Sequence, residues 1–415
     1  MKIKTAFTVV FSILTMFSTA QQTVVGKLSG NRVPELKITY DEGSNSLNSG
    51  LISMFYTGGT IDNNLKDYNL QRLKKNNIYG RNIDISLIYK KENGRIFGFD
   101  HTGWQAGVEW HNLMSVKFGE DLYKLIFYGN KIFAGTTADL SPTAFRYLNY
   151  YQLKAGLNRI SVNGHSKYGF NIAFNLGNNQ GAADFTNSGF YTSPAGDSLT
   201  LSGNMSYKYQ SLNTVSFGKI NGYGTAIDFF YTYDNPSVFK IEAQINNLGI
   251  IWWNDESFEF TQSEPIVWEG LEVDNLLQMP DPLMEKSGTD SLKEYIGNNS
   301  QQKSFTTYTP AGIKLKMSKM LLPGKIRGVM AADYRLFVFY RPRIVLQADF
   351  LINDKISLSP NLSYGGWHGF NAGFEFEYKF NEYSRLQIGT KYLSGMILQN
   401  YFSGFGGFLN FTFQI

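Results

Sequence analysis

Few side chains in this sequence are arranged for chemistry. The 415 residues include no cysteine, which excludes disulfides, thiolate metal sites and cysteine nucleophiles. The four histidines, His101, His111, His165 and His368, are far apart, and none lies in a metal-binding HExxH motif. A serine–histidine–acid triad drawn from separate strands would leave no spacing signal, and no other feature favours one. We therefore expect no enzyme activity, no metal and no cofactor.

One pair of acids, Glu375 and Glu377, is spaced as an acid/base couple could be, and Lys379 follows two residues later. Residues two apart lie on the same face of a strand, so these three side chains form a charged row on one face. Such a row is more typical of an ion-pair ladder than of an acid/base couple.

The surrounding residues show what positions that row. From Phe370 to Phe380 the even positions are aromatic or apolar, whereas the odd ones are polar, charged or glycine. This alternation indicates a strand with a different solvent on each side. Similar patterns occur at 145–157, 239–246, 343–350, 83–89, 170–176, 227–233, 313–317 and 386–392.

Alternation also occurs in secreted β-sandwiches, but three features favour a membrane barrel. Neighbouring strands are joined by short turns, as at Asn353-Asp354 and Asn381-Glu382, and their apolar faces are rich in Phe and Tyr. The chain also ends in an alternating strand, 409–415, which needs a first strand to pair with. We predict an all-β, transmembrane, antiparallel up-and-down β-barrel of about 14 strands with both termini in the periplasm.

The N-terminus has the pattern of a cleavable signal peptide. Lys2 and Lys4 precede an apolar stretch, 6–17, and the small residues Ser18, Thr19 and Ala20 form a cleavage site. About 12 apolar residues are too few for a spanning helix, which needs ~20. We expect residues 1–20 to be removed and 21–415 to form a single barrel domain in the cell outer membrane. With 38 basic and 34 acidic residues, the chain is too balanced for nucleic acid to be an expected partner.

Two segments interrupt the strand pattern. Residues 120–128 place Leu122, Leu125 and Ile126 at helical spacing before Gly129, which predicts a short connecting helix. Residues 254–303 hold eleven acids against three lysines, together with many apolar residues. This acidic insertion is therefore too apolar for a free acidic tail and should pack against other residues.

The strand phases predict what faces the lumen. Twelve bases are expected to point inward: Lys90, Arg146, Lys154, Lys240, Lys314, Lys316, Arg327, Arg335, Arg343, Lys379, Arg385 and Lys391. Seven acids share that orientation: Asp84, Asp228, Glu242, Asp333, Asp349, Glu375 and Glu377. The excess of bases suggests that the acidic insertion plugs the barrel through Glu264, Trp268, Glu269, Glu272 and Asp274. Gating residues would then be Arg146, Lys154, Lys240, Lys314, Lys316, Arg343, Glu375, Glu377 and Lys379. The alternative is that the insertion is a solvated loop or small cap.

Several motifs resemble those of a Bacteroidota outer-membrane barrel family of unknown function. They are YGNKIFAG from Tyr128, INNLGIIWW from Ile245, WEGLEVDNLL from Trp268, DSLK from Asp290 and YTP from Tyr308. The resemblance implies an outer-membrane barrel similar to the FadL-type transporters of hydrophobic compounds, but it provides no ligand and no catalytic residues.

Two functions are compatible with these sequence features. The first is a passive channel or transporter for small or hydrophobic molecules, gated by the acidic insertion. The second is a non-conducting barrel that acts as a scaffold or accessory subunit of a secretion or envelope-assembly complex. The expected partners are outer-membrane lipid together with a small-molecule ligand or an envelope protein.

Overall fold

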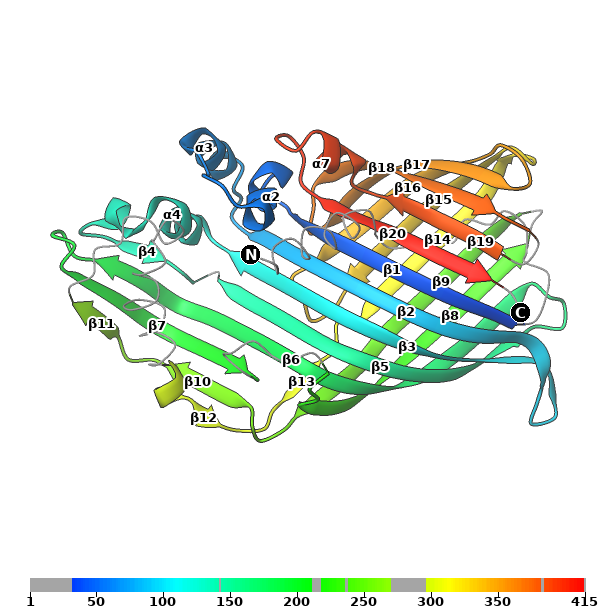
Figure 1. Ribbon diagram of the computed structural model, residues 1–415, viewed down its shortest axis with the longest axis horizontal. Helices are drawn as coiled ribbons and strands as arrows, with labels where there is room; N and C mark the ends of the chain where they lie inside the picture. The colour runs from blue at the N-terminus through cyan, green and yellow to red at the C-terminus, as the bar shows by residue number, and fades with distance from the viewer. Residues whose placement is uncertain are drawn as a thin grey trace.

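Fourteen antiparallel strands form a closed wall in the computed structural model of the protein (Figure 1). The structure describes residues 32–141, 143–210, 218–235, 238–269, 296–381 and 384–413. The wall strands in chain order are β1 (Arg32–Ser44), β2 (Asn77–Ile96), β3 (Phe99–Phe118), β5 (Ala144–Ile160), β6 (Ser166–Thr192), β8 (Gly222–Asn235), β9 (Phe239–Trp253), β14 (Gly312–Leu322), β15 (Ile326–Arg335), β16 (Arg341–Leu351), β17 (Ile356–Gly366), β18 (Phe370–Lys379), β19 (Ser384–Thr390) and β20 (Phe405–Phe413).

Pairing of the last strand with the first closes the wall. β20 lies antiparallel to β1, from Glu35 opposite Thr412 to Glu42 opposite Phe405. A closed sheet leaves no unpaired edge, which is the condition for β-structure in a hydrocarbon layer. The prediction of a closed antiparallel barrel of about 14 strands is therefore confirmed.

The two faces of the wall differ as the alternation predicts. In β16, for example, Arg343, Val345 and Gln347 are buried, whereas Ile344 and Leu346 between them are exposed. The same contrast continues around the barrel. Its exposed outward side chains include Leu87, Val108, Leu153, Ile172, Leu315, Met330, Ile344, Leu346 and Leu362. The outer surface is thus an apolar belt, and the inward face is largely polar.

The two ends of the barrel are unlike each other. At one end, which we name the turn end, short connections join β2 to β3, β14 to β15 and β16 to β17. At the other, the loop end, lie α2 (Ser49–Thr57), α3 (Asn63–Gln71), α4 (Glu120–Tyr128), η1 (Asn130–Phe133), β4 (Thr137–Asp139) and α7 (Leu393–Ile397). The short helix predicted at 120–128 is confirmed as α4. Within the described ranges, no helix has both the length and the apolar character needed to cross a membrane.

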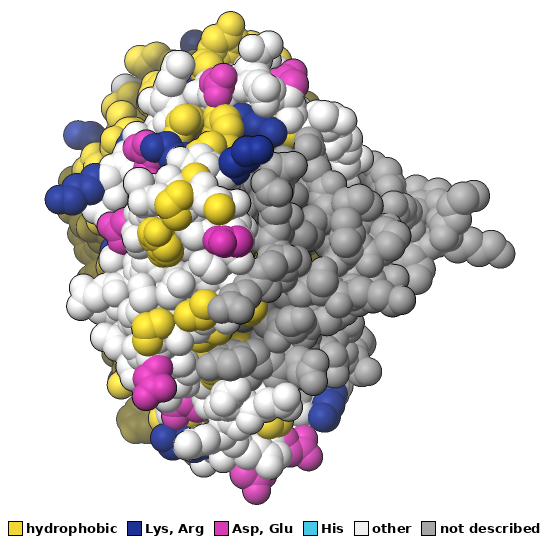
Figure 2. Space-filling view, turned by 90° about the vertical axis from the view of Figure 1, so that its left-hand side faces the viewer, with side chains coloured by type: hydrophobic (Ala, Val, Ile, Leu, Met, Phe, Trp, Pro, Cys, Tyr) yellow, Lys and Arg dark blue, Asp and Glu magenta, His cyan; other side chains and the backbone are white. Residues whose placement is uncertain are grey.

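A sheet extends the wall beyond the barrel at the loop end. β6 is 27 residues long, and its second half pairs with β7 (Ser198–Tyr209) instead of β8. β7 in turn pairs with β10 (Phe258–Gln262) and β11 (Ile266–Glu269), while β12 (Gln301–Gln302) pairs with β10 and β13 (Thr306–Tyr308) with β9. The described part of the acidic insertion therefore contributes strands to this extension. Figure 2 looks onto the loop end, where acidic and basic side chains are interspersed with apolar ones.

A buried carboxylate attaches α2 to the wall. Glu42 of β1 is fully buried and accepts hydrogen bonds from the hydroxyls of Tyr40 and Tyr79 and, at 2.5 Å, of Tyr56 in α2. Burial and the nearby Glu42 charge raise the pKa of the Tyr56 hydroxyl, so this hydroxyl stays a donor. The apolar residues Leu51 and Ile52 of α2 complete the contact.

This attachment predicts a large effect of removing the carboxylate. Glu42→Ala leaves three hydroxyls without their acceptor, so we expect the unfolding free energy to fall by about 2–3 kcal/mol or more. Urea titration of the refolded protein in detergent micelles measures it. The matched control is Glu256→Ala, because Glu256 and its partner Lys219 are both exposed and should change stability by less than ~0.5 kcal/mol. Equal effects of the two substitutions would contradict the prediction.

Candidate functional site

A cluster of polar side chains around Arg343 lies across the lumen near the loop end. The Arg343 guanidinium donates to Asp41 Oδ2 at 3.1 Å, to Asp333 Oδ1 at 2.9 Å and to the Tyr392 hydroxyl at 2.6 Å. His368 Nε2 lies 2.7 Å from the other Asp41 oxygen. Four wall strands separate β16, which carries Arg343, from β1, which carries Asp41. These buried contacts therefore span the interior and do not simply follow the wall.

Two glycines make room for the residues that close this region. Gly43 and Gly80 are opposite each other on β1 and β2 and both face inward. A Cβ on Gly80 would lie 2.0 Å from Trp367 Cε2, and one on Gly43 would lie 2.0 Å from His368 Nδ1. Trp367 is fully buried, and its ring meets that of Tyr340 edge-on at 5.0 Å. The loop after β17 therefore places two rings against a flat, side-chain-free part of the opposite wall, which we name the glycine cradle.

The end of β15 and the loop that follows it add a second bridge across the lumen. Arg335 Nη1 donates to Asn82 Oδ1 at 2.9 Å, and its Nη2 lies 3.9 Å from Asp84. Six wall strands separate β15 from β2 in either direction, so this contact joins opposite sides of the barrel. The backbone of Phe339 also exchanges hydrogen bonds of 3.1 and 3.3 Å with the Ser115 hydroxyl on β3.

From Asp84, a chain of charged contacts continues around the inner wall. Asp84 Oδ1 lies 2.7 Å from His111 Nδ1, and His111 Nε2 lies 3.1 Å from Glu109. Lys154 then pairs with both Glu109 and Asp228 at 2.9 Å. Buried charges are costly unless they are paired, and each member of this chain has its partner.

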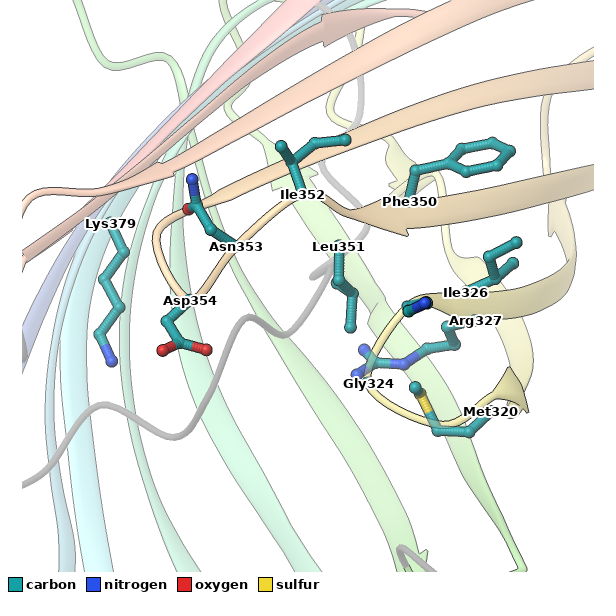
Figure 3. A pocket seen from close by; sticks show the side chains of 11 residues that line it. Met320, Gly324, Ile326, Arg327, Phe350, Leu351, Ile352, Asn353, Asp354 and Lys379 are labelled. Carbon is teal, nitrogen blue, oxygen red and sulfur yellow. The ribbon is translucent and has the colours of Figure 1, made fainter.

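A cavity of about 960 Å³ is bordered at the turn end by the turns after β14 and β16 and by the end of β18 (Figure 3). Its lining combines the bases Arg327 and Lys379 and the acid Asp354 with the apolar Met320 and Leu351. This turn-end cavity is a mixed vestibule that could receive small molecules.

The predicted lumen residues are distributed along the whole lumen. Arg146 is at the loop end, 2.7 Å from Asp184, and Lys379 is at the turn end. Between them, Lys240 and Lys316 flank Glu242 at 2.6 and 3.6 Å, and Lys314 is paired in register with Asp333. Gln347 Nε2 donates to Glu375 at 3.4 Å, and Gln387 Nε2 donates to Glu377. Of the predicted gating residues, the structure therefore brings Lys154 and Arg343 into the networks described above. The other gating residues lie at different heights along the lumen.

Three of the five predicted plug residues are described, and they lie in or next to the extension sheet. Glu264 is exposed, and Trp268 of β11 is paired with Leu199 of β7. Glu269 ends β11, while Glu272 and Asp274 lie outside the described residues. Plugging by the insertion therefore stays a prediction, because the described residues that cross the lumen come from other loops.

Several lumen residues were not predicted from the sequence. Glu35, Asp41 and Glu109 also face inward, as does Lys37, so these four add three acids and one base to the predicted set. The signal on β1 was present, because Glu35, Lys37, Thr39 and Asp41 alternate with Leu36, Ile38 and Tyr40. Trp367 and His368 had no such signal, since they lie in a loop. The interior is therefore closer to neutral than the sequence suggests.

The glycine cradle gives a stability prediction. Gly80→Ala should force Trp367 out of place and lower the unfolding free energy by about 1–3 kcal/mol, the usual effect of overpacking. The control is Gly312→Ala on β14, where a Cβ would meet no atom within 4 Å. Urea unfolding of both variants measures the difference. A Gly80→Ala variant as stable as the control would show that Trp367 does not occupy the cradle.

Comparison with known proteins identifies a family. A family model described as "Family of unknown function (DUF5723)" matches residues 34–385. No curated protein matches the sequence. Among solved structures, a TodX monoaromatic hydrocarbon channel mutant is similar at 8% identity, with 96% of each chain covered and a TM-score of 0.48. The toluene transporter TodX of P. putida has 10% identity, coverage of 93% of this chain and 90% of that one, and a TM-score of 0.43. A FadL homologue of Pseudomonas aeruginosa has 8% identity, coverage of 92% and 90%, and a TM-score of 0.44.

Proposed function

Since the chain belongs to the DUF5723 family of unknown function, we propose its function from geometry: it is an outer-membrane barrel that conducts small molecules. One observation carries this proposal. A closed wall separates an apolar outer belt from a polar interior, as in a barrel that spans a membrane around an aqueous path. A barrel of this kind is exported, so the proposal includes a signal peptide in residues 1–20, outside the described residues. Short turns face the periplasm in outer-membrane barrels, so the turn end is the periplasmic end of this barrel.

The loops that cross the lumen are the proposed gate. Phe339 connects the loop after β15 to Ser115 of β3, and Trp367 and His368 connect the loop after β17 to β2 and β1. No disulfide ties these loops to the wall, because the chain has no cysteine. They can therefore leave the lumen without breaking a wall strand. The lining is charged and hydrogen-bonding, which suits small polar solutes better than hydrophobic ones. We assign it no catalytic role.

A reversible lock tests this gate. Ser115 and Phe339 adjoin each other on the wall and the loop, and the chain has no cysteine of its own. A Ser115→Cys/Phe339→Cys variant can therefore form a single disulfide across the lumen. In planar bilayers we expect the oxidised protein to remain closed and the reduced protein to show openings like those of the unmodified chain.

A second substitution is designed to open the proposed gate. Trp367→Ala should empty the cradle and raise the open probability at least tenfold, whereas Trp252→Ala, at an exposed position, should leave it unchanged. The heat-dependent shift in gel mobility shows that each barrel is folded. If neither the disulfide lock nor Trp367→Ala changes the conductance, the loops after β15 and β17 are not a gate.

The acidic insertion is a further proposed gating element. Trp253 N–H donates to the Phe305 carbonyl at 2.8 Å, so the two ends of residues 254–303 are adjacent and can be joined directly. Charge attraction between the insertion and the inward bases supports this proposal. If the deletion leaves single-channel conductance and open probability unchanged, the insertion has no gating role.

The alternative function is a non-conducting scaffold. Fully buried contacts such as Arg343–Asp41 favour it, because they fill the lumen and are expensive to separate. If neither the native chain, Trp367→Ala nor the deletion conducts although all are folded, the scaffold becomes the better account. Co-purification with a constant envelope protein would then identify the partner.

A further inference from the structure

A row of small side chains crosses the outer face of the barrel from β15 to β17. Gly328 is paired with Ala348. Gln347 pairs with Asn361 and Phe350 with Leu358, which places Ala348 beside Pro360. All three lie in the apolar belt, where their neighbours along each strand are much larger.

Two ridges of large apolar side chains border this row. One ridge runs in register through Met317, Met330, Leu346 and Leu362. The other runs through Ile326, Phe350, Leu358 and Phe376. Along the first ridge, over Gly328, Ala348 and Pro360, lies a predominantly apolar cavity of about 630 Å³, which we name the outer groove.

The two ends of the outer groove are chemically different. Lys319 of β14 is exposed and paired with Gly328, so its ammonium group stands at the start of the groove. At the other end the groove reaches Ala372 of β18, which is paired with Leu362. Four inter-strand steps of ~4.8 Å make the groove about 19 Å long.

We propose that the outer groove binds one acyl chain of an anionic glycerophospholipid, whose phosphate pairs with Lys319. An apolar slot in the belt suits hydrocarbon, and the single cation at one end suits the head group. Lys319 is three residues before the end of β14 at the turn end, which places the head group in the leaflet on that side. The inference rests on the membrane location in the proposed function, but not on conduction.

Native mass spectrometry tests this binding. The refolded full mature chain is incubated in detergent with phosphatidylglycerol or phosphatidylcholine, and retained lipid per chain is counted. We expect about one phosphatidylglycerol per native chain. Ala348→Leu should reduce retention at least fivefold by filling the groove, and Ala372→Leu at its border is a second filling variant. Lys319→Gln should remove the preference for phosphatidylglycerol over phosphatidylcholine, about fivefold for one cation.

The matched control makes the same exchange elsewhere on the belt. Ala106 of β3 faces outward beside Val108, and Ala106→Leu should retain lipid like the native chain. Gel mobility confirms folding of every variant before lipid is counted. Equal retention by Ala348→Leu, Ala372→Leu and the native chain, or an equal loss in Ala106→Leu, would overturn the proposal. Failure of the protein to enter lipid bilayers at all would instead refute the membrane location.

Discussion

Closure of the wall is the constraint on which the rest of the structure depends. Once β20 pairs with β1, the inward side chains of fourteen strands share one enclosed space. Charges in such a space must find partners there, because few of them reach water. Arg343 with Asp41 and Asp333, and Lys154 with Glu109 and Asp228, are the result. The interior is therefore organised by pairing across strands that are far apart in the sequence.

Filling the lumen also required places without side chains. The paired glycines Gly43 and Gly80 allow Trp367 and His368 to approach the opposite wall. The loops after β15 and β17 can thus close the barrel from within while the wall remains regular. The turn end has no comparable crossing among the residues that the structure describes, and a mixed cavity opens there. This difference between the ends is the physical basis for the proposed gate.

The outer face follows a simpler rule. Apolar side chains cover it because nothing in a hydrocarbon layer can pair with a polar group. Its shape is nevertheless uneven, since Gly328 and Ala348 lie low beside a ridge of Met and Leu. The proposed lipid contact therefore depends on particular residues of this belt.

The sequence by itself determined the barrel, the approximate strand number, the helix at 120–128 and the orientation of Arg343, Lys154 and Glu375. Period-two alternation carries that information locally, and the side that each residue faces follows from the same count. Only the tertiary structure decided which charges meet, because Arg335 and Asn82 are separated by 253 positions yet lie on opposite walls of one lumen. The positions of Trp367 and His368 were likewise decided only by the tertiary structure. A loop residue has no periodicity, and its place in the lumen depends on two glycines hundreds of residues away in the chain.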